Sequence, residues 1–307
     1  MREEVVAVVP LHNPDAGVHE RLERIGRQVA FLVVVDDGSD EPFVAADSQT
    51  DMSVIRQPNA GIARALNVGI RRALAARPSS GYVLTVDQDS LLDESFVAQS
   101  LRAFTAAQRD GVDVAATATE RHNEKPAAFI GNVRGHRIAL HVAQSGMVFS
   151  RQGLEQVGLF DESLVIDVVE TDWCLRARRL GKHVVLARGT SMGHPVGDVI
   201  PIRVGGRAIT IAGRKRTLSH HSALRRYYIT RNRVLVYPRY RSVAAAWLLR
   251  DTVAEARTLV LSLLLGRDPA AQLFATIAGL VDGVVGRRGK AADWLVRAFD
   301  GANGKRS

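Results

Sequence analysis

Two carboxylates lie on either side of Gln88, at the end of a short apolar run of the sequence. They are Asp87 and Asp89, and the run covers residues 82–86. Such a pair can bind a divalent cation, because Mg²⁺ and Mn²⁺ prefer oxygen ligands and Mg²⁺ usually takes one or two carboxylates together with substrate phosphates. A cation held there would neutralise a departing diphosphate. Aspartate also suits a strand-end turn or a helix N-cap, so the pair alone leaves a structural interpretation open.

A second acidic cluster, Asp36-Asp37-Gly38-Ser39, follows the apolar run 31–35. An aspartate at this place can accept a hydrogen bond from the N–H of a pyrimidine base. Gly38 allows the backbone to turn sharply. An ordinary Asp-Gly turn is the alternative, so this cluster indicates a nucleotide site only in combination with others.

The segment from Asn59 to Asn67 begins a helical pattern. Gly61 permits the close approach of a ligand to the backbone, and the N-terminus of a helix attracts anions. Arg64 lies one turn into the pattern, where it can reach a nucleotide. A solvated arginine on a capped helix is the alternative for that residue.

The elements that must position these clusters are three short, β-branched apolar runs, at residues 5–9, 31–35 and 82–86. Runs of this kind are typical of strands buried on both faces of a parallel sheet. Helical patterns at 17–28 and 60–76 lie between them. The alternation of strands and helices predicts an α/β fold with a doubly wound sheet.

Ligands of doubly wound sheets bind beyond the carboxyl ends of the strands, so the polar residues that follow the runs are expected to converge. Those after the first run include Pro10, His12 and Asn13. Farther along, the sequence predicts a strand ending at Phe149, helices over 150–157 and 170–180, a strand over 183–187 and an Ala/Leu-rich helical region from Ser242.

Together these segments resemble the family 2 glycosyltransferases of the GT-A fold. The matching pieces, in the same order and spacing, are Val8-Val9-Pro10-Leu11-His12-Asn13, Val35-Asp36-Asp37-Gly38-Ser39, Asn59–Asn67 and Val86-Asp87-Gln88-Asp89. Many members have Thr-Tyr-Asn where this chain has Leu-His-Asn. The resemblance implies a mostly parallel sheet with a C-terminal helical extension. It also implies that the nucleotide sugar contacts Pro10, His12, Asn13, Asp36, Asp37, Asn59, Gly61, Arg64, Asp87 and Gln88.

The second half of the chain extends the resemblance. Residues 144–150 look like the family's acceptor-side strand, which implies that Gly146 and Trp173 face the acceptor. Residues 160–178 look like its catalytic segment. Aligned on Trp-Cys-Leu-Arg, Glu170 takes the place of the general base and Asp172 lies beside it.

Inversion at the anomeric carbon needs such a base, because a carboxylate must take the proton of the attacking hydroxyl. Acids in the first turn of a helix are the structural alternative for both residues. The resemblance also implies a Mg²⁺ or Mn²⁺ cofactor, with Asp89 as the main ligand, Asp87 nearer the ribose or metal and His194 as a further ligand.

The charge of the chain is uneven. The formal net charge of the chain is +9 at pH 7. The stretch from Val199 to Arg250 contains twelve Lys or Arg residues and no Asp or Glu. Such a block indicates an anionic partner: a sugar nucleotide, a lipid diphosphate, a membrane surface or a nucleic acid. Nucleic-acid binding needs the same mix of Arg and Tyr, but three acidic clusters would repel a phosphate backbone.

Within this block, residues 221–233 are similar to the Arg-Tyr-Tyr and Arg-Asn segment of bacterial rhamnosyltransferases and related galactofuranosyltransferases. The resemblance implies that Arg225, Tyr228 and Arg231 also bind the nucleotide sugar. We therefore expect a metal-dependent, inverting transfer of L-rhamnose from dTDP-rhamnose to a hydroxyl of a lipid-linked or cell-surface glycan. UDP-galactofuranose as the donor, and a non-catalytic anion- or nucleic-acid-binding α/β protein, are the alternatives.

We expect a catalytic domain at 1–238, a helical region at 239–300 that contacts a membrane or another subunit, and a tail at 301–307. Cys174 is the only cysteine, which excludes an intrachain disulfide. The acidic N-terminus gives no export signal, and the uncharged stretch 269–281 is shorter than the roughly 20 residues of a membrane span. The expected location is cytoplasmic, peripheral at the inner face of the plasma membrane.

Overall fold

The computed structural model describes residues 5–46, 50–123, 125–193 and 221–303, and short segments between 193 and 221 (199–201, 203–204, 207–208, 210–211, 214–215 and 217–219). The chain forms two compact units. The first is Met1–Val165 with Val169–Pro195, and the second is Ile166–Val168 with Val196–Ser307. This division differs from the boundary expected at residue 238. It groups helix α6 (Ala223–Val236) with the C-terminal helices because α6 packs along α8 (Pro269–Val284).

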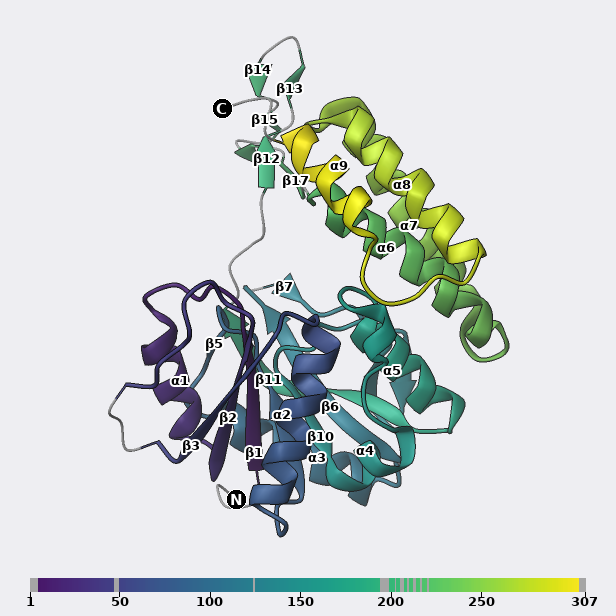
Figure 1. Ribbon diagram of the computed structural model, residues 1–307. Helices are drawn as coiled ribbons and strands as arrows, with labels where there is room; N and C mark the ends of the chain where they lie inside the picture. The colour runs from purple at the N-terminus through teal and green to yellow at the C-terminus, as the bar shows by residue number, and fades with distance from the viewer. Residues whose placement is uncertain are drawn as a thin grey trace. The chain divides into compact units, whose positions relative to one another are not determined.

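The first unit is built on one mixed sheet (Figure 1) with the strand order β3-β2-β1-β4-β10-β6-β11-β9-β8. Strands β3, β2, β1 and β4 are parallel, and β10 runs antiparallel to β4 and β6. The strands are β1 (Val5–Leu11), β2 (Phe31–Asp37), β3 (Met52–Gln57), β4 (Tyr82–Thr85), β5 (Leu91–Leu92), β6 (Val114–His122), β7 (Lys125–Pro126), β8 (Gly131–Val133), β9 (His136–Ala139), β10 (Met147–Ser150) and β11 (His183–Gly193). The three predicted apolar runs are thus neighbouring parallel strands, and their carboxyl ends meet at one edge.

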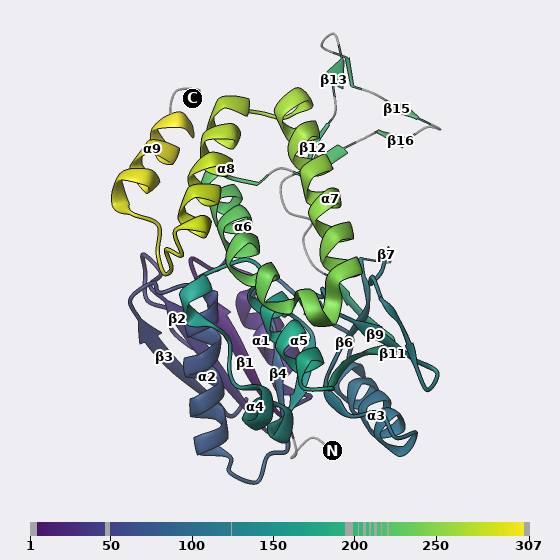
Figure 2. The ribbon, with the colours of Figure 1, turned by 90° about the vertical axis from the view of Figure 1, so that its right-hand side faces the viewer.

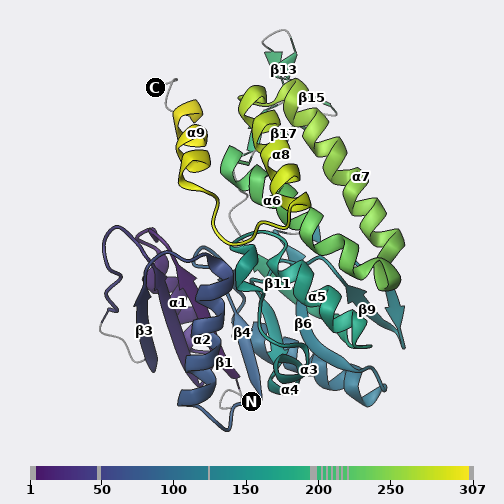
Figure 3. The same ribbon diagram turned by 45° about the vertical axis from the view of Figure 1, so that its right-hand side comes forward.

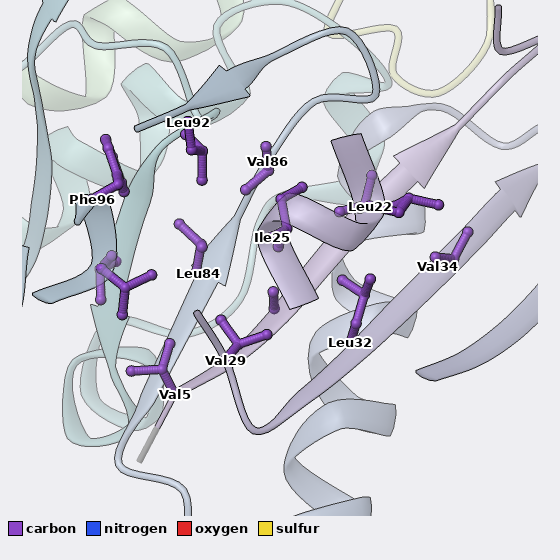
Figure 4. Close-up of a cluster of buried hydrophobic side chains, with 14 of the residues drawn as sticks. Val5, Leu22, Ile25, Val29, Leu32, Val34, Leu84, Val86, Leu92 and Phe96 are labelled. Atoms are coloured by element: carbon purple, nitrogen blue, oxygen red, sulfur yellow. The ribbon is translucent and has the colours of Figure 1, made fainter. Parts of the chain in front are cut away.

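Helices cover both faces of this sheet (Figure 3). They are α1 (Val18–Gly26), α2 (Ile62–Ala76), α3 (Phe96–Arg109), α4 (Arg151–Val157) and α5 (Val169–Arg179). On one face, alternate residues of β1, β2 and β4 pack with Leu22 and Ile25 of α1 and with Phe96 of α3 (Figure 4). On the other face, Gly69 of α2 lies so close to Val8 and Val35 that a side chain there would overlap Val8. The doubly wound α/β prediction is confirmed.

The second unit contains α6, α7 (Arg241–Leu265), α8 and α9 (Asp293–Asn303), and Figure 2 shows its helices side by side. Two glycines let α6 and α8 approach closely. A Cβ added to Gly279 would lie 2.7 Å from the Tyr227 carbonyl oxygen, and one on Gly283 would lie 2.6 Å from the Val234 Cβ. A hydrogen bond of 2.7 Å from the Tyr227 hydroxyl to Asp282 fixes the same pair of helices.

Three short antiparallel pairs precede these helices in the sequence: β12 (Val199–Pro201) with β17 (Thr217–Ser219), β13 (Arg203–Val204) with β14 (Arg207–Ala208), and β15 (Thr210–Ile211) with β16 (Arg214–Lys215). Within the described residues, no helix combines the length and the apolar character that a membrane crossing requires.

Candidate functional site

The loops after β1, β2 and β4 are tied to one another by hydrogen bonds. The His12 amide donates to Gln88 Oε1 at 2.8 Å, and Gln88 Nε2 donates to the His12 carbonyl at 3.1 Å. The His12 ring lies 3.2 Å through Nδ1 from the Asp37 carbonyl, where the nitrogen donates because a carbonyl only accepts. Asn13 binds the second loop as well, through Ser39 Oγ (2.9 Å) and Asp40 (3.1 Å). The convergence of strand ends is therefore confirmed.

Asp36 is buried and shapes the turn after β2. Its carboxylate accepts the amides of Ser39 at 2.9 Å and Phe43 at 3.1 Å. Burial raises the pKa of Asp36, but these hydrogen bonds and the charge of Arg56 outweigh it and leave the pKa below its ordinary value. The side chain is 1% exposed, and in this structure it shapes the turn. The direct contact with a nucleotide that the resemblance implies for it stays a prediction.

Asp37, also buried, supports the loop that begins α2. Its Oδ1 accepts from Gln57 Nε2 at 2.7 Å and from the Ala60 amide at 2.8 Å, and its Oδ2 accepts from the Gly61 amide at 2.9 Å. Gly61 has φ +92°, a backbone conformation that L side chains rarely adopt. A Cβ there would also lie 2.6 Å from Val165. Asp37 thus sets the path of the chain into the helix.

The residues that this loop presents to solvent are Asn59 and Arg64, both exposed. They flank the N-terminus of α2, where the helix dipole favours an anion. The α2 end is positioned from the other side by a 3.4 Å hydrogen bond from the Ala63 amide to the Val165 carbonyl. The arrangement is suited to binding a phosphate group.

Asp87, Gln88 and Asp89 are half-buried at the end of β4. The Asp87 amide donates to Ser145 Oγ at 2.9 Å, and the Gln144 side-chain amide donates to the Asp87 carboxylate. Residues 144 and 145 are thereby built into the site, although the sequence pattern singled out only their place in an acceptor-side strand. Pro10, by contrast, is a buried residue of β1.

A divalent cation would find two carboxylates here, the number that Mg²⁺ usually takes from a protein alongside phosphate oxygens. The donor set of Asp87 and Asp89 therefore fits the expected cofactor. Among the described residues, no group of three or more His, Cys, Asp or Glu is arranged to hold a metal. The predicted third ligand, His194, lies outside the described residues.

Glu170 occupies the first turn of α5 and is half-buried. Asp172, two residues on, is 2% exposed and accepts a 2.9 Å hydrogen bond from Arg176 Nε. Arg176 also donates to the carbonyls of Val157 (2.9 Å) and Leu159 (2.7 Å). Asp172 is therefore the anchor of a structural arginine, and Glu170 is the more accessible of the two acids. The spacing of four between Asp172 and Arg176 was the sequence signal for this pair.

Both residues expected at the acceptor are buried. Trp173 is fully buried, stands edge-on to Phe149 with ring centroids 4.7 Å apart, and donates from Nε1 to the Gly158 carbonyl at 2.8 Å. Gly146, at φ +79°, lies against Thr119 and Phe96. Trp173 fixes α5 on the sheet through these contacts. The acceptor role that the resemblance implies for Trp173 and Gly146 stays a prediction.

In the second unit, Tyr228 and Arg231 are buried. The contact with the nucleotide sugar that the resemblance implies for them stays a prediction. Arg231 donates from Nε and Nη2 to Asn232 Oδ1, at 3.0 and 2.9 Å, and lies over the Tyr228 ring at 4.8 Å. The Tyr228 hydroxyl accepts the Ala291 amide at 2.8 Å. The polar ends of Tyr228 and Arg231 are enclosed by the packing of the second unit. Their hydrogen bonds are therefore made to other groups of that unit.

Arg225 is half-exposed and binds Asp167 through Nε and Nη2, at 3.0 to 3.2 Å. The sequence pattern did not single out Asp167 or Asn232. Asn232 is fully buried and donates to the carbonyls of residues 166 and 167. The only signal for it was its place beside Arg231 in the Arg-Asn pair.

The sheet order, the joined strand-end loops and the carboxylate pair define the first unit as a glycosyltransferase domain of the GT-A fold. Residues 6–156 match the model of glycosyl transferase family 2, and this domain of the chain belongs to that family.

The chain is 28% identical over 255 residues to the dTDP-rhamnosyl transferase RfbF of Shigella flexneri, a match that covers 77% of this chain and 80% of that protein. Two solved structures share the fold at low identity. The S. aureus TarS 1–349 structure has a TM-score of 0.54 at 14% identity, and covers 92% of this chain and 81% of that one. The structure of GalNAc-T7 with UDP, GalNAc and Mn²⁺ has a TM-score of 0.51 at 12% identity and covers 62% of this chain. This chain spans 43% of that GalNAc-T7 chain.

Proposed function

We propose that this glycosyltransferase moves L-rhamnose from dTDP-L-rhamnose to a hydroxyl of a lipid-linked or cell-surface glycan, with inversion. The observation that carries the donor assignment is the similarity to a dTDP-rhamnosyl transferase along 77% of the chain. That match reaches beyond residues 6–156, so it extends past the family domain alone.

The donor diphosphate binds at the N-terminus of α2, beside the exposed Asn59 and Arg64. The support for this placement is the loop that Asp37 holds by its three hydrogen bonds. Helix dipole and guanidinium together favour a dianionic group. The base of the nucleotide lies against the turn after β2, beside the loop that Asp37 holds.

Asp89 and Asp87 would hold a divalent cation, which when bound supplies positive charge to stabilise the departing diphosphate. The GalNAc-T7 structure of the same fold contains Mn²⁺. The two carboxylates at the end of β4 provide oxygen ligands of the kind that Mn²⁺ and Mg²⁺ prefer.

Glu170 is the general base that takes the proton of the acceptor hydroxyl. Two features support it over Asp172: it is half-buried rather than enclosed, and Asp172 is bound to Arg176. The attack by the deprotonated oxygen on the anomeric carbon, opposite the diphosphate, requires no covalent enzyme intermediate.

Thermal unfolding with a panel of nucleotides tests the donor assignment. The midpoint should rise with dTDP and dTDP-L-rhamnose in the presence of Mn²⁺ or Mg²⁺, because a ligand that binds only the folded state stabilises it. A matched panel of UDP, UDP-galactofuranose and GDP is the comparison. A larger rise with UDP-galactofuranose, followed by galactofuranosyl transfer to a glycan acceptor, would replace the rhamnose proposal.

A further inference from the structure

We propose that Asn232 and Arg225 of α6 are positioning residues, which hold residues 166–168 in a strained conformation and so set the direction in which α5 begins. The inference rests on the proposed role of Glu170, which is two residues beyond the held segment. Neither α6 residue is proposed to touch the substrate.

The segment is strained because two of its three residues, and the residue just before it, have left-handed backbone angles. Val165 has φ +67°, Asp167 +60° and Val168 +63°. Such angles are rare for residues with a Cβ, and for β-branched valine they are outliers. Strained residues persist only where the surrounding structure fixes them, and they cluster at functional sites.

Asn232 supplies part of that fixation. Its Nδ2 donates to the Ile166 carbonyl at 2.8 Å and to the Asp167 carbonyl at 2.9 Å. Its Oδ1 accepts from two nitrogens of Arg231. Because a guanidinium only donates, the amide has one consistent orientation, with the oxygen toward Arg231 and the nitrogen toward the two carbonyls.

Arg231 is itself held in place, so the support extends through the second unit. Its guanidinium lies over the rings of Tyr227 (5.4 Å) and Tyr228 (4.8 Å), and Nη1 donates to the Gly289 carbonyl at 2.5 Å. Arg225 adds a second attachment through its paired contacts with the Asp167 carboxylate. Such two-nitrogen pairs fix direction as well as distance.

Residues 166–168 lie between Val165, which contacts the loop that begins α2, and α5, which carries Glu170. Val165, just before the held segment, accepts the Ala63 amide of α2 through its carbonyl and packs on Gly61, in the loop that begins α2. Val169 alone separates the segment from Glu170 in the first turn of α5. A displacement of about 1 Å at a reacting group can cost about 10²-fold in rate. Trp173 and Arg176 fix the body of α5, so the direction of the chain at 166–168 acts on its first turn, which carries Glu170.

The test uses Asn232→Asp, which keeps the shape and the acceptor for Arg231 but replaces the two donated hydrogen bonds by a carboxylate facing two carbonyls. Arg225→Leu is the second variant; its side chain is half-exposed, so the fold tolerates the change. Thr230→Ala, on the same helix, is the matched control, because its hydroxyl bonds within the helix to the Arg226 carbonyl.

Two measurements are made on the full chain. Hydrogen–deuterium exchange should show faster exchange of amides 166–170 in Asn232→Asp and Arg225→Leu and unchanged exchange in Thr230→Ala. The turnover number should fall by about 10²-fold in Asn232→Asp, with an unchanged dissociation constant for dTDP and a turnover number near that of the wild type in Thr230→Ala.

Wild-type turnover in Asn232→Asp, with or without faster exchange, would overturn the proposal. An equal loss of turnover in Thr230→Ala would also overturn it, because the effect would then belong to the helix as a whole. Exchange needs no turnover, so it reports on the held segment even if Glu170→Gln remains fully active. That last result would reject the base assignment and not the attachment of residues 166–168 to α6.

Discussion

Asp37 Oδ2 accepts the backbone amide of Gly61 at 2.9 Å, across 24 residues of sequence. This bond joins the end of β2 to the loop that begins α2, and two further bonds to Asp37 Oδ1 strengthen the same connection. The aspartate after the second strand therefore acts on the nucleotide site through the loop it holds. That relation changes what a substitution at residue 37 should do.

Asp37→Ala should weaken dTDP binding and lower the stability of the fold together. The substitution removes the buried carboxylate that accepts three hydrogen bonds, so the donating N–H groups of Gln57, Ala60 and Gly61 lose their acceptor. An unsatisfied buried amide costs about 1–3 kcal/mol. Isothermal calorimetry with dTDP and urea unfolding measure the two effects. Asp110→Ala, at an exposed aspartate bound to His136, is the control. Unchanged affinity for both dTDP and UDP would reject the nucleotide site at this loop.

Asp36 should make stability depend on acid pH. Its folded pKa lies below the ordinary value of 3.8, so its carboxylate contributes stability in full above that value. The contribution is lost as the pH falls through the lower folded pKa. In urea unfolding, the free energy of unfolding of the wild type should exceed that of Asp36→Asn most at neutral pH, and the difference should shrink as the pH falls below 3.8. A difference that grows on acidification would contradict the sign.

Glu170→Gln should reduce the turnover number by about 10²- to 10⁴-fold, because it removes a general base while preserving the shape. The dissociation constant for the donor should stay near that of the wild type, since the base contacts the acceptor. Asp172→Asn should instead lower the free energy of unfolding by about 2 kcal/mol, the scale of a hydrogen bond to a charged group, because Arg176 loses its partner. Normal turnover in Glu170→Gln with a well-folded, inactive Asp172→Asn would reverse the assignments.

Asp89→Asn should lower both metal affinity and transfer. Wild-type transfer should stop in EDTA and return with Mn²⁺ or Mg²⁺, because the proposed cation stabilises the leaving diphosphate. Asp93→Asn, an exposed aspartate four residues on, is the matched control and should behave as the wild type. Full transfer in EDTA by the wild type would refute metal dependence.

Helix α8 should bind anionic membranes. Its exposed apolar residues recur at helical spacing, at Leu273, Ile277, Leu280 and Val284, and exposed Arg287 and Arg288 follow them. An apolar stripe flanked by basic residues can lie in the headgroup layer. In flotation with anionic liposomes at low salt, the wild type should rise with the liposomes. Val284→Asp should reduce the fraction that rises. Leu180→Asp, at an exposed leucine outside α8, is the control and should rise as the wild type does. Concentration-dependent dimerisation without flotation would assign the stripe to a second copy of the chain.

The sequence by itself determined strands β1, β2 and β4, helices α1, α2, α4 and α5, and the convergence of the loops that follow the three strands. Strand β3 and helix α3 were not predicted from it. Three β-branched apolar runs became β1, β2 and β4 because strands buried on both faces need uniformly apolar side chains. Parallel strands bring their carboxyl ends to one edge, so the clusters at residues 12–13, 36–39 and 87–89 had to converge.

The tertiary structure alone decided which polar residues face outward and which are enclosed. Asp36 and Asp37 share a residue type and a strand end, yet one shapes its own turn and the other holds a loop more than twenty residues away. Tyr228 and Arg231 have the chemistry of a phosphate site, but helix packing buries them. Left-handed angles at Asp167 and Val168 depend on contacts from residues about sixty positions later. Composition and periodicity report local preference and burial on average, whereas these roles follow from long-range contacts that exist only once the chain has folded.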